Sequence, residues 1–220
     1  MNVTIRQFEF HDTTAQEALT VRIPEVTEAN YGLYIWPCAP VLAQYVWLNR
    51  NRVTGKHVLE IGAGTSLPGV VASKCGARVT LSDRSTSPQC LSLCHHSAEL
   101  NDLTGVSVMG LTWGQVTPSL VSLPKVDIIL ASDCFYDTKD FENVMMTLSY
   151  LLHKNPEAEV WCCYQERSSE RTVEHLMDKW QLCGKMVEIP SLETMTSSFS
   201  GHVCHVIQMF IIRLQTNQTL

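Results

Sequence analysis

The sequence lacks a long apolar run. No stretch of about 18 residues is free of charged and strongly polar side chains, so a membrane span is not expected. The first ten residues contain no basic stretch followed by an apolar one, which a secretory signal requires. An excess of positive charge is also missing, because 16 Lys and Arg stand against 22 Asp and Glu, giving a net charge of −6. Phosphate backbones need clustered basic side chains, so direct nucleic-acid binding is not expected, and basic protein segments are the better electrostatic match.

The cysteines give no sign of a disulfide framework. Their number, nine, is odd, and no secretory route is apparent, which favours reduced thiols and a cytoplasmic and nuclear protein. A run of four potential metal ligands, Cys90, Cys94, His95 and His96, lies on one predicted helix. A zinc site needs a second pair of ligands, which the sequence does not offer, so no metal is expected.

Neither a repeat nor a low-complexity stretch divides the chain. Its 220 residues predict one domain, with residues 1–30 as an N-terminal extension and residues 31–220 as the core. The extension carries strand patterns at 3–10 and 19–23, which suggest a hairpin whose second strand ends at Pro24.

Beyond the extension, strand and helix patterns alternate. Strands are predicted at 58–61, 78–82, 106–111, 126–131 and 160–164, with two more near 185–189 and at 202–214 that would pair as an antiparallel edge. Helices are predicted at 39–50, 67–75, 88–101, 141–153 and 171–182, and a Ser- and Thr-rich loop at 190–201. This alternation predicts an α/β fold with a Rossmann-like, mostly parallel seven-stranded sheet covered by helices on both faces. Ligands of such sheets bind at the carboxyl ends of the strands.

A glycine turn follows the first core strand. Gly62 and Gly64 permit close approach of a ligand to the backbone, and Ser66 is placed to cap the next helix. Asp83 follows Gly64 by nineteen residues, the spacing of an acid that grips ribose hydroxyls. Nicotinamide dinucleotide binding is a rival interpretation, but its motif needs glycine where this chain has Leu67.

Several motifs together resemble one enzyme family. The segment Val58-Leu-Glu-Ile-Gly-Ala-Gly64, with its acidic Glu60, resembles motif I of the seven-β-strand S-adenosylmethionine-dependent methyltransferases. Trp36 before a helix, Trp113 after the third core strand and the segment Asp133-Cys-Phe-Tyr136 extend this resemblance to methyltransferase family 16. That family contains many protein lysine methyltransferases.

The resemblance implies S-adenosylmethionine as the cofactor and a set of residues around it. These are Asp83 at the ribose, Trp113 at the adenine, Trp36 close to the cofactor, and Glu60, Gly62, Gly64 and Ser132 at its amino-acid end.

For catalysis the resemblance implies Asp133 and Tyr136. The acceptor must be neutral to attack the methyl group, and only ~1 in 2,500 lysine amines is neutral at pH 7. Asp133 would accept a hydrogen bond from the amine and Tyr136 would form a wall of the channel. Arginine is the competing acceptor, but the two-glutamate loop typical of arginine methyltransferases is missing, since Glu166 and Glu170 stand apart.

The expected function is therefore methyl transfer to a protein side chain, lysine before arginine, with a histone or a chaperone as a possible partner. The alternatives are a small-molecule N-methyltransferase, a non-catalytic module that binds the cofactor and a protein partner, and, third, a dehydrogenase. The sequence predicts no oligomeric state.

Overall fold

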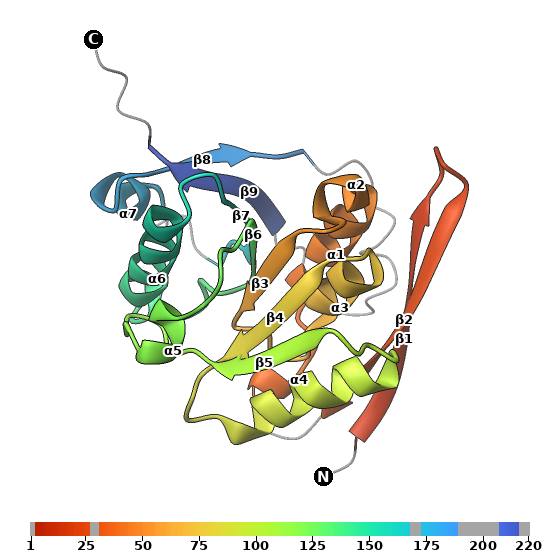
Figure 1. Cartoon of the computed structure of the whole chain (residues 1–220). Helices are drawn as coiled ribbons and strands as arrows, with labels where there is room; N and C mark the ends of the chain where they lie inside the picture. Colours follow the sequence, from red (N-terminus) through yellow and green to blue (C-terminus); the bar gives the residue numbers. More distant parts are fainter. Residues whose placement is uncertain (1–2, 27–30, 168–172, 189–206, 216–220) are drawn as a thin grey trace.

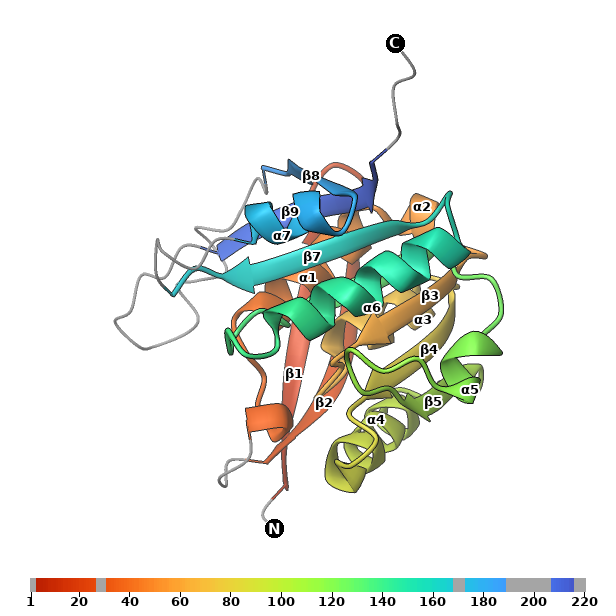
Figure 2. The same cartoon turned by 90° about the vertical axis from the view of Figure 1, so that its left-hand side faces the viewer.

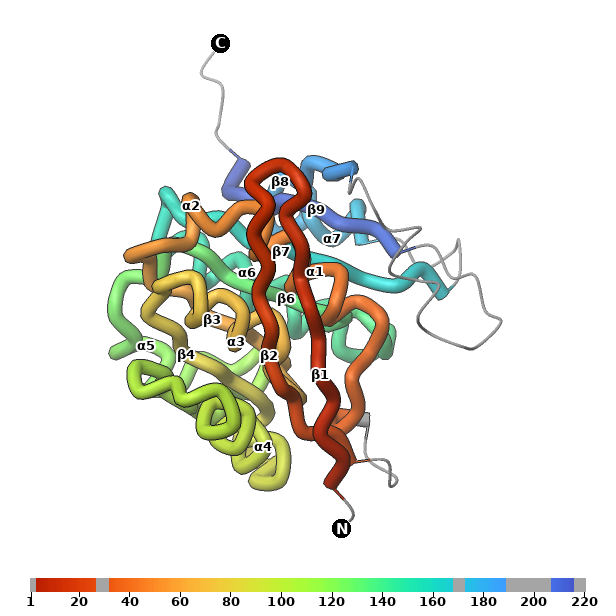
Figure 3. The backbone as a smooth tube through the Cα atoms, turned by 90° about the vertical axis from the view of Figure 1, so that its right-hand side faces the viewer, coloured from red at the N-terminus to blue at the C-terminus, as the bar shows by residue number. Residues whose placement is uncertain are grey.

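The N-terminal residues form a long hairpin in this computed structural model, which describes residues 3–26, 31–167, 173–188 and 207–215. Strand β1 (Val3–Asp12) pairs antiparallel with β2 (Glu17–Val26), and the hairpin lies over α1 (Cys38–Leu48) and α3 (Leu67–Lys74), as Figure 3 shows. The prediction that Pro24 ends the second strand was wrong: it pairs opposite Ile5 within the hairpin. A two-stranded sheet consists of edge strands, where proline is tolerated.

The hairpin's apolar side chains divide between its two faces. Phe10, Val21 and Ile23 are buried against the rest of the protein. Val3 and Ile5 are exposed, because the apolar alternation changes phase between Ile5 and Phe8. The hairpin therefore contributes one buried face to the core.

The remaining strands form one sheet of seven, as predicted. They are β3 (His57–Ile61), β4 (Arg78–Asp83), β5 (Val106–Gly110), β6 (Ile128–Ser132), β7 (Glu159–Gln165), β8 (Leu182–Met186) and β9 (Ile207–Leu214). Their order is β5-β4-β3-β6-β7-β9-β8, and β9 runs antiparallel to both neighbours. The predicted pairing of the last two strands is confirmed, although β8 begins three residues before its predicted start at 185 and takes the end of the predicted helix 171–182. The predicted loop at 190–201 lies outside the described residues.

Helices cover both faces of this sheet (Figures 1 and 2). Besides α1 and α3 they are η1 (Tyr31–Leu33), α2 (Arg50–Val53), α4 (Pro88–Leu100), α5 (Pro118–Val121), α6 (Phe141–Lys154) and α7 (Glu174–Lys179). Buried residues of α1 and α3 belong to the core of one face, and those of α6 and α7 to the core of the other. Within the described ranges, no helix has the length and apolar character needed to cross a membrane.

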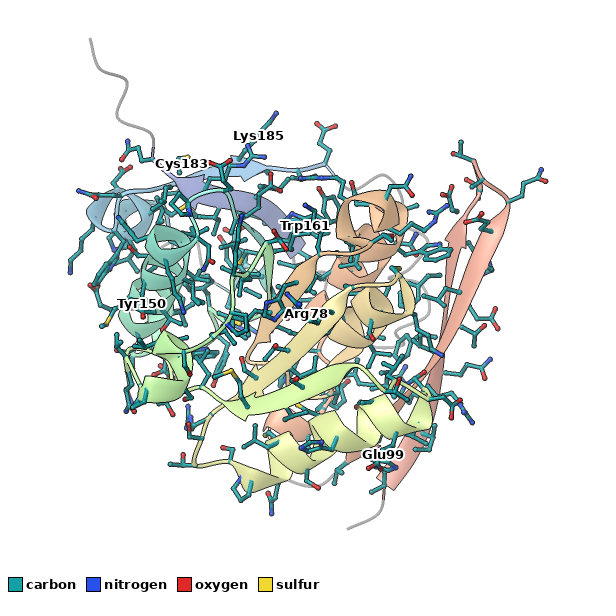
Figure 4. All side chains as sticks on the ribbon, viewed as in Figure 1. Arg78, Glu99, Tyr150, Trp161, Cys183 and Lys185 are labelled. Carbon is teal, nitrogen blue, oxygen red and sulfur yellow. The ribbon has the colours of Figure 1, made fainter. Side chains whose placement is uncertain are left out.

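Strand β7 illustrates why the central strands read as continuous apolar runs. Trp161 faces one core and packs edge-to-face on Tyr45 of α1, with ring centroids 5.0 Å apart; it is labelled near the centre of Figure 4. Val160 and Cys162 face the other core. Successive side chains of a strand point to opposite faces, so a strand with a core on each side is apolar throughout.

The strand order reverses between β3 and β6. The chain passes outward from β3 through β4 to β5, and then returns to place β6 and β7 on the other side of β3. The carboxyl ends of β3, β4 and β6 therefore meet beside this switch point, where α/β sheets bind their ligands.

Candidate active site

A cleft of about 830 Å³ opens at these carboxyl ends. All nine residues predicted from the sequence line it: Trp36, Glu60, Gly62, Gly64, Asp83, Trp113, Ser132, Asp133 and Tyr136. The fold thus brings the predicted residues together, while the role of each stays a prediction.

The turn after β3 requires its glycines. Gly62 and Gly64 have φ angles of +58° and +50°, a backbone region that other residues adopt at a cost. A Cβ atom on Gly62 would lie 2.7 Å from Cζ2 of Trp113, and one on Gly64 would lie 3.0 Å from the carbonyl oxygen of Gly32. The main-chain N–H of Gly64 donates to Oδ2 of Asp83 at 2.8 Å, so that carboxylate braces the turn.

Helix α3 starts differently from the prediction. Ser66 has a φ of +66°, its hydroxyl makes no cap hydrogen bond, and its Oγ is buried without a hydrogen-bond partner in the described part of the chain. The capping role predicted for Ser66 was wrong, because the left-handed backbone differs from the extended conformation of an N-cap. Helix α3 approaches β3 closely at Gly69, because a Cβ atom there would lie only 2.4 Å from Oε2 of Glu60.

Two buried carboxyl groups lie beside the glycine turn. Burial raises the pKa of Glu60 to about 8, although the main-chain N–H of Gly69 donates to its Oε2 at 3.0 Å. Burial also raises the pKa of Asp83, opposed by main-chain N–H donors from Gly64 and Arg84. Oε1 of Glu60 is buried without a partner among the residues described. A buried carboxylate oxygen without a donor is costly unless a cation or another donor reaches it.

These groups fit S-adenosylmethionine. Glu60 would receive its ammonium group, which is a cationic donor, and Asp83, which already accepts the main-chain N–H groups of Gly64 and Arg84, would accept from a ribose hydroxyl. Trp113 packs over Gly62 and lies edge-to-face with Tyr136, with ring centroids 6.4 Å apart, so it joins the glycine turn to the Asp133–Tyr136 segment. That Trp113 contacts adenine stays a prediction.

At the end of β6 the structure adds a residue that the sequence analysis missed. Asp133 has a φ of +52° and is almost completely buried. Its carboxylate pairs with the guanidinium of Arg167, Nη1 to Oδ1 at 2.9 Å and Nη2 to Oδ2 at 2.6 Å. Arg167 lies just beyond the carboxyl end of β7, and it also lines the cleft. The sequence feature that could have revealed Arg167 is its position directly after a predicted parallel strand.

Two further lining residues were also missed. Tyr34 lies edge-to-face on Trp36, with ring centroids 5.3 Å apart. Cys90 of α4 lies beside Asp83, and burial raises the pKa of its thiol to about 11, so it is protonated at neutral pH. No group of three His, Cys, Asp or Glu side chains placed to hold a metal occurs among the described residues.

Comparison with known proteins places the chain in a family. The profile of the family described as "Lysine methyltransferase" matches residues 15–180. The chain is similar to "Histone-arginine methyltransferase METTL23" of Xenopus laevis, with 46% identity over 95% of this chain and 92% of the relative. It is also similar to the human protein of that name, with 51% identity over 72% and 82% of the two chains. "Protein N-lysine methyltransferase METTL21A" of Danio rerio is 30% identical over 67% of this chain and 68% of its own.

A solved structure agrees on the fold. "SMU.776, a putative methyltransferase complexed with SAH" superposes with a TM-score of 0.60 and 15% identity, covering 89% of this chain and 54% of that one. Its cofactor is S-adenosylmethionine. The chain belongs to the lysine methyltransferase family and is a protein methyltransferase.

Proposed function

We propose that the chain methylates an arginine side chain of a histone. The support for arginine and for histones comes from the relatives that are 46% and 51% identical, both named histone-arginine methyltransferases. One observation of the structure carries the proposal: the glycine turn with Asp83 and the Asp133–Tyr136 motif line the same cleft. The cofactor and the acceptor nitrogen can therefore meet there.

The residues of the cleft have distinct tasks in this reaction. When bound, S-adenosylmethionine supplies a methyl group that passes to the acceptor nitrogen as the sulfonium becomes a thioether. Asp133 accepts an N–H of the acceptor side chain and orients its nitrogen, while Tyr136 forms one wall. A guanidinium is protonated at neutral pH, so one proton must leave the acceptor nitrogen during the transfer, along its hydrogen bond to Asp133 and from there to solvent. The net charge of −6 favours encounter with basic histone segments.

Lysine is the second candidate acceptor. Asp133 has one acceptor position left after its described hydrogen bonds, which suits one N–H of an amine better than the fork of a guanidinium. The family description and the relative at 30% identity also name lysine. The proposal also includes a chaperone as an alternative partner and residence in both cytoplasm and nucleus, and cell fractionation tests the second.

The test uses radiolabelled S-adenosylmethionine and purified histones, with Asp133→Asn as the control enzyme. We expect label in protein, and methyl-arginine after hydrolysis to amino acids. Methyl-lysine would replace the first candidate by the second. Cofactor binding without protein label would contradict both and favour a small-molecule substrate or a non-catalytic module.

A further inference from the structure

The inference concerns Arg167, whose guanidinium holds Asp133 by a fork. Both nitrogens bond to the carboxylate, and Nη1 also donates to the carbonyl oxygen of Gln165 at 3.2 Å. A bidentate, charge-assisted pair of this kind fixes the plane of a carboxylate as well as its charge.

Burial makes this pair important for Asp133. The side chain of Asp133 is 5% exposed and that of Arg167 is 25% exposed. Thiols of Cys38 in α1, of Cys134 and of Cys162 in β7 lie near the carboxylate, and burial raises the pKa of each, so they carry no charge at neutral pH. An ionised carboxylate at such a place needs a charged partner, which Arg167 provides.

The hydrogen bonds leave a defined remainder. Oδ1 accepts from Arg167 Nη1 and from the main-chain N–H of Gln165 at 3.3 Å, whereas Oδ2 accepts from Arg167 Nη2. A carboxylate offers about four acceptor positions, so within the described residues one remains, on Oδ2. This is the position available to an acceptor nitrogen in the cleft.

We propose that Arg167 is a positioning residue: it remains on Asp133 during methyl transfer and presents one fixed acceptor position, at Oδ2, to the substrate nitrogen. The inference rests on the proposed function. The nearby positive charge also disfavours a protonated substrate nitrogen, which favours loss of its proton during the transfer.

An opposite role would be that of an internal competitor. Arg167 would then occupy the place of a substrate arginine and leave Asp133 when the substrate binds. The two roles predict opposite effects of removing the side chain, because a competitor inhibits and a positioning residue promotes turnover.

The experiment combines Arg167→Ala with ethylguanidinium, a small ion that can refill the vacated space. We expect kcat for histone methylation to fall about 10–100-fold, as for misplacement of a reacting group, with little change in the Kd of the cofactor. Added ethylguanidinium should restore part of kcat in Arg167→Ala and none in the double variant that also carries Asp133→Asn. Arg78→Ala removes an exposed arginine at the start of β4, labelled in Figure 4, and should keep wild-type activity with no response to the ion.

Three results would overturn the inference. Unchanged kcat in Arg167→Ala would do so, as would a lower KM together with inhibition by ethylguanidinium, which identifies a competitor. Where Arg167→Ala does not fold, Arg167→Lys is the variant to use, because it keeps the charge and loses the fork. Full kcat in Arg167→Lys is the third result that would overturn the inference. If the wild-type protein binds cofactor but labels no histone, the proposed function itself is contradicted. That result differs from full activity in the variants, which would contradict only the role of Arg167.

Discussion

Glu60 and Asp133 are two buried carboxyl groups in one cleft, yet their surroundings differ. Glu60 has one main-chain donor, an oxygen without a described partner, and a pKa raised by burial to about 8. Asp133 has a guanidinium fork and a main-chain donor. Glu60, on the side proposed for the cofactor (the cofactor half), thus leaves a demand for a cation. Asp133, on the side proposed for the acceptor nitrogen (the acceptor half), has that demand met by Arg167 of its own chain. The first half is suited to receive a charged ligand and the second to orient a nitrogen.

The largest effect is expected from a substitution in the acceptor half of the cleft. Asp133→Asn keeps the left-handed backbone, which asparagine tolerates, and removes the charge. We expect kcat to fall by about 10²–10⁴-fold, the range for a group that assists proton removal, with cofactor affinity close to wild type. Single-turnover assays and calorimetry measure the two quantities. Asp127→Asn, which precedes β6 at its opposite end and keeps its acceptor for the N–H of His57, is the matched control. Equal losses in both variants would argue against a special role of Asp133.

The next effect breaks the glycine turn. Gly62→Ala adds left-handed strain of about 1–2 kcal/mol, and a contact of its Cβ with Trp113 at 2.7 Å adds crowding of about 1–3 kcal/mol. Gly55→Ala, at φ +74° with open space around its Cβ, has the strain without the crowding. We expect the free energy of unfolding, measured with denaturant, to fall more in Gly62→Ala, and cofactor binding to suffer only there. Identical stability losses would mean that Trp113 moves aside freely.

The cofactor half was the easier one to predict from sequence. Its determinants are local: a strand, a glycine turn, a helix and an acid at a fixed spacing, and Asp83 does contact Gly64 nineteen residues away. The glycines are required by backbone angles that only a turn imposes. Local spacing fixes such geometry before tertiary packing acts.

The acceptor half depends on contacts that spacing does not reveal. Arg167 meets Asp133 across 34 positions, and the pair forms because two parallel strands end side by side. Ser66 looked like a cap because its residue type suits one, but the turn places it in the left-handed region. Residue type alone does not encode either arrangement, since both follow from how neighbouring strands end.

A smaller effect tests the ribose acceptor. Asp83→Ala removes a carboxylate that also holds the N–H of Gly64. Hydrogen bonds to a charged group contribute about 1.5–3 kcal/mol, so we expect their loss to weaken cofactor binding by about 10–100-fold. Calorimetric titration with S-adenosylmethionine measures it, and Asp133→Asn serves as the control that spares binding. Unaltered affinity in Asp83→Ala would remove it from the cofactor site.

The last prediction concerns the charge of Glu60 and is seen only in how stability varies with pH. Its folded pKa, about 8, exceeds the ordinary value of 4.5, so the folded protein binds the proton more tightly than the unfolded chain does. The associated stability is therefore complete below about pH 4.5 and is lost as the pH rises through 8, with a slope of up to about 1.4 kcal/mol per pH unit. Glu60→Gln lacks this loss, so its Tm relative to wild type should rise with pH over that interval.

The matched control for Glu60→Gln is Glu142→Gln. Hydrogen bonding to Lys179 lowers the pKa of Glu142, so its contribution is lost only as the pH falls through that lower value. Between pH 5 and 8 the Tm difference of this variant from wild type should stay level.

Cofactor binding supplies an independent check on Glu60, because an ammonium group beside Glu60 favours its carboxylate and should release a proton near pH 7. Titrations in two buffers of different ionisation enthalpy detect that proton. A binding enthalpy that is equal in both buffers would mean that Glu60 keeps its protonation state on binding, which would contradict an ionisation of Glu60 by the ammonium group.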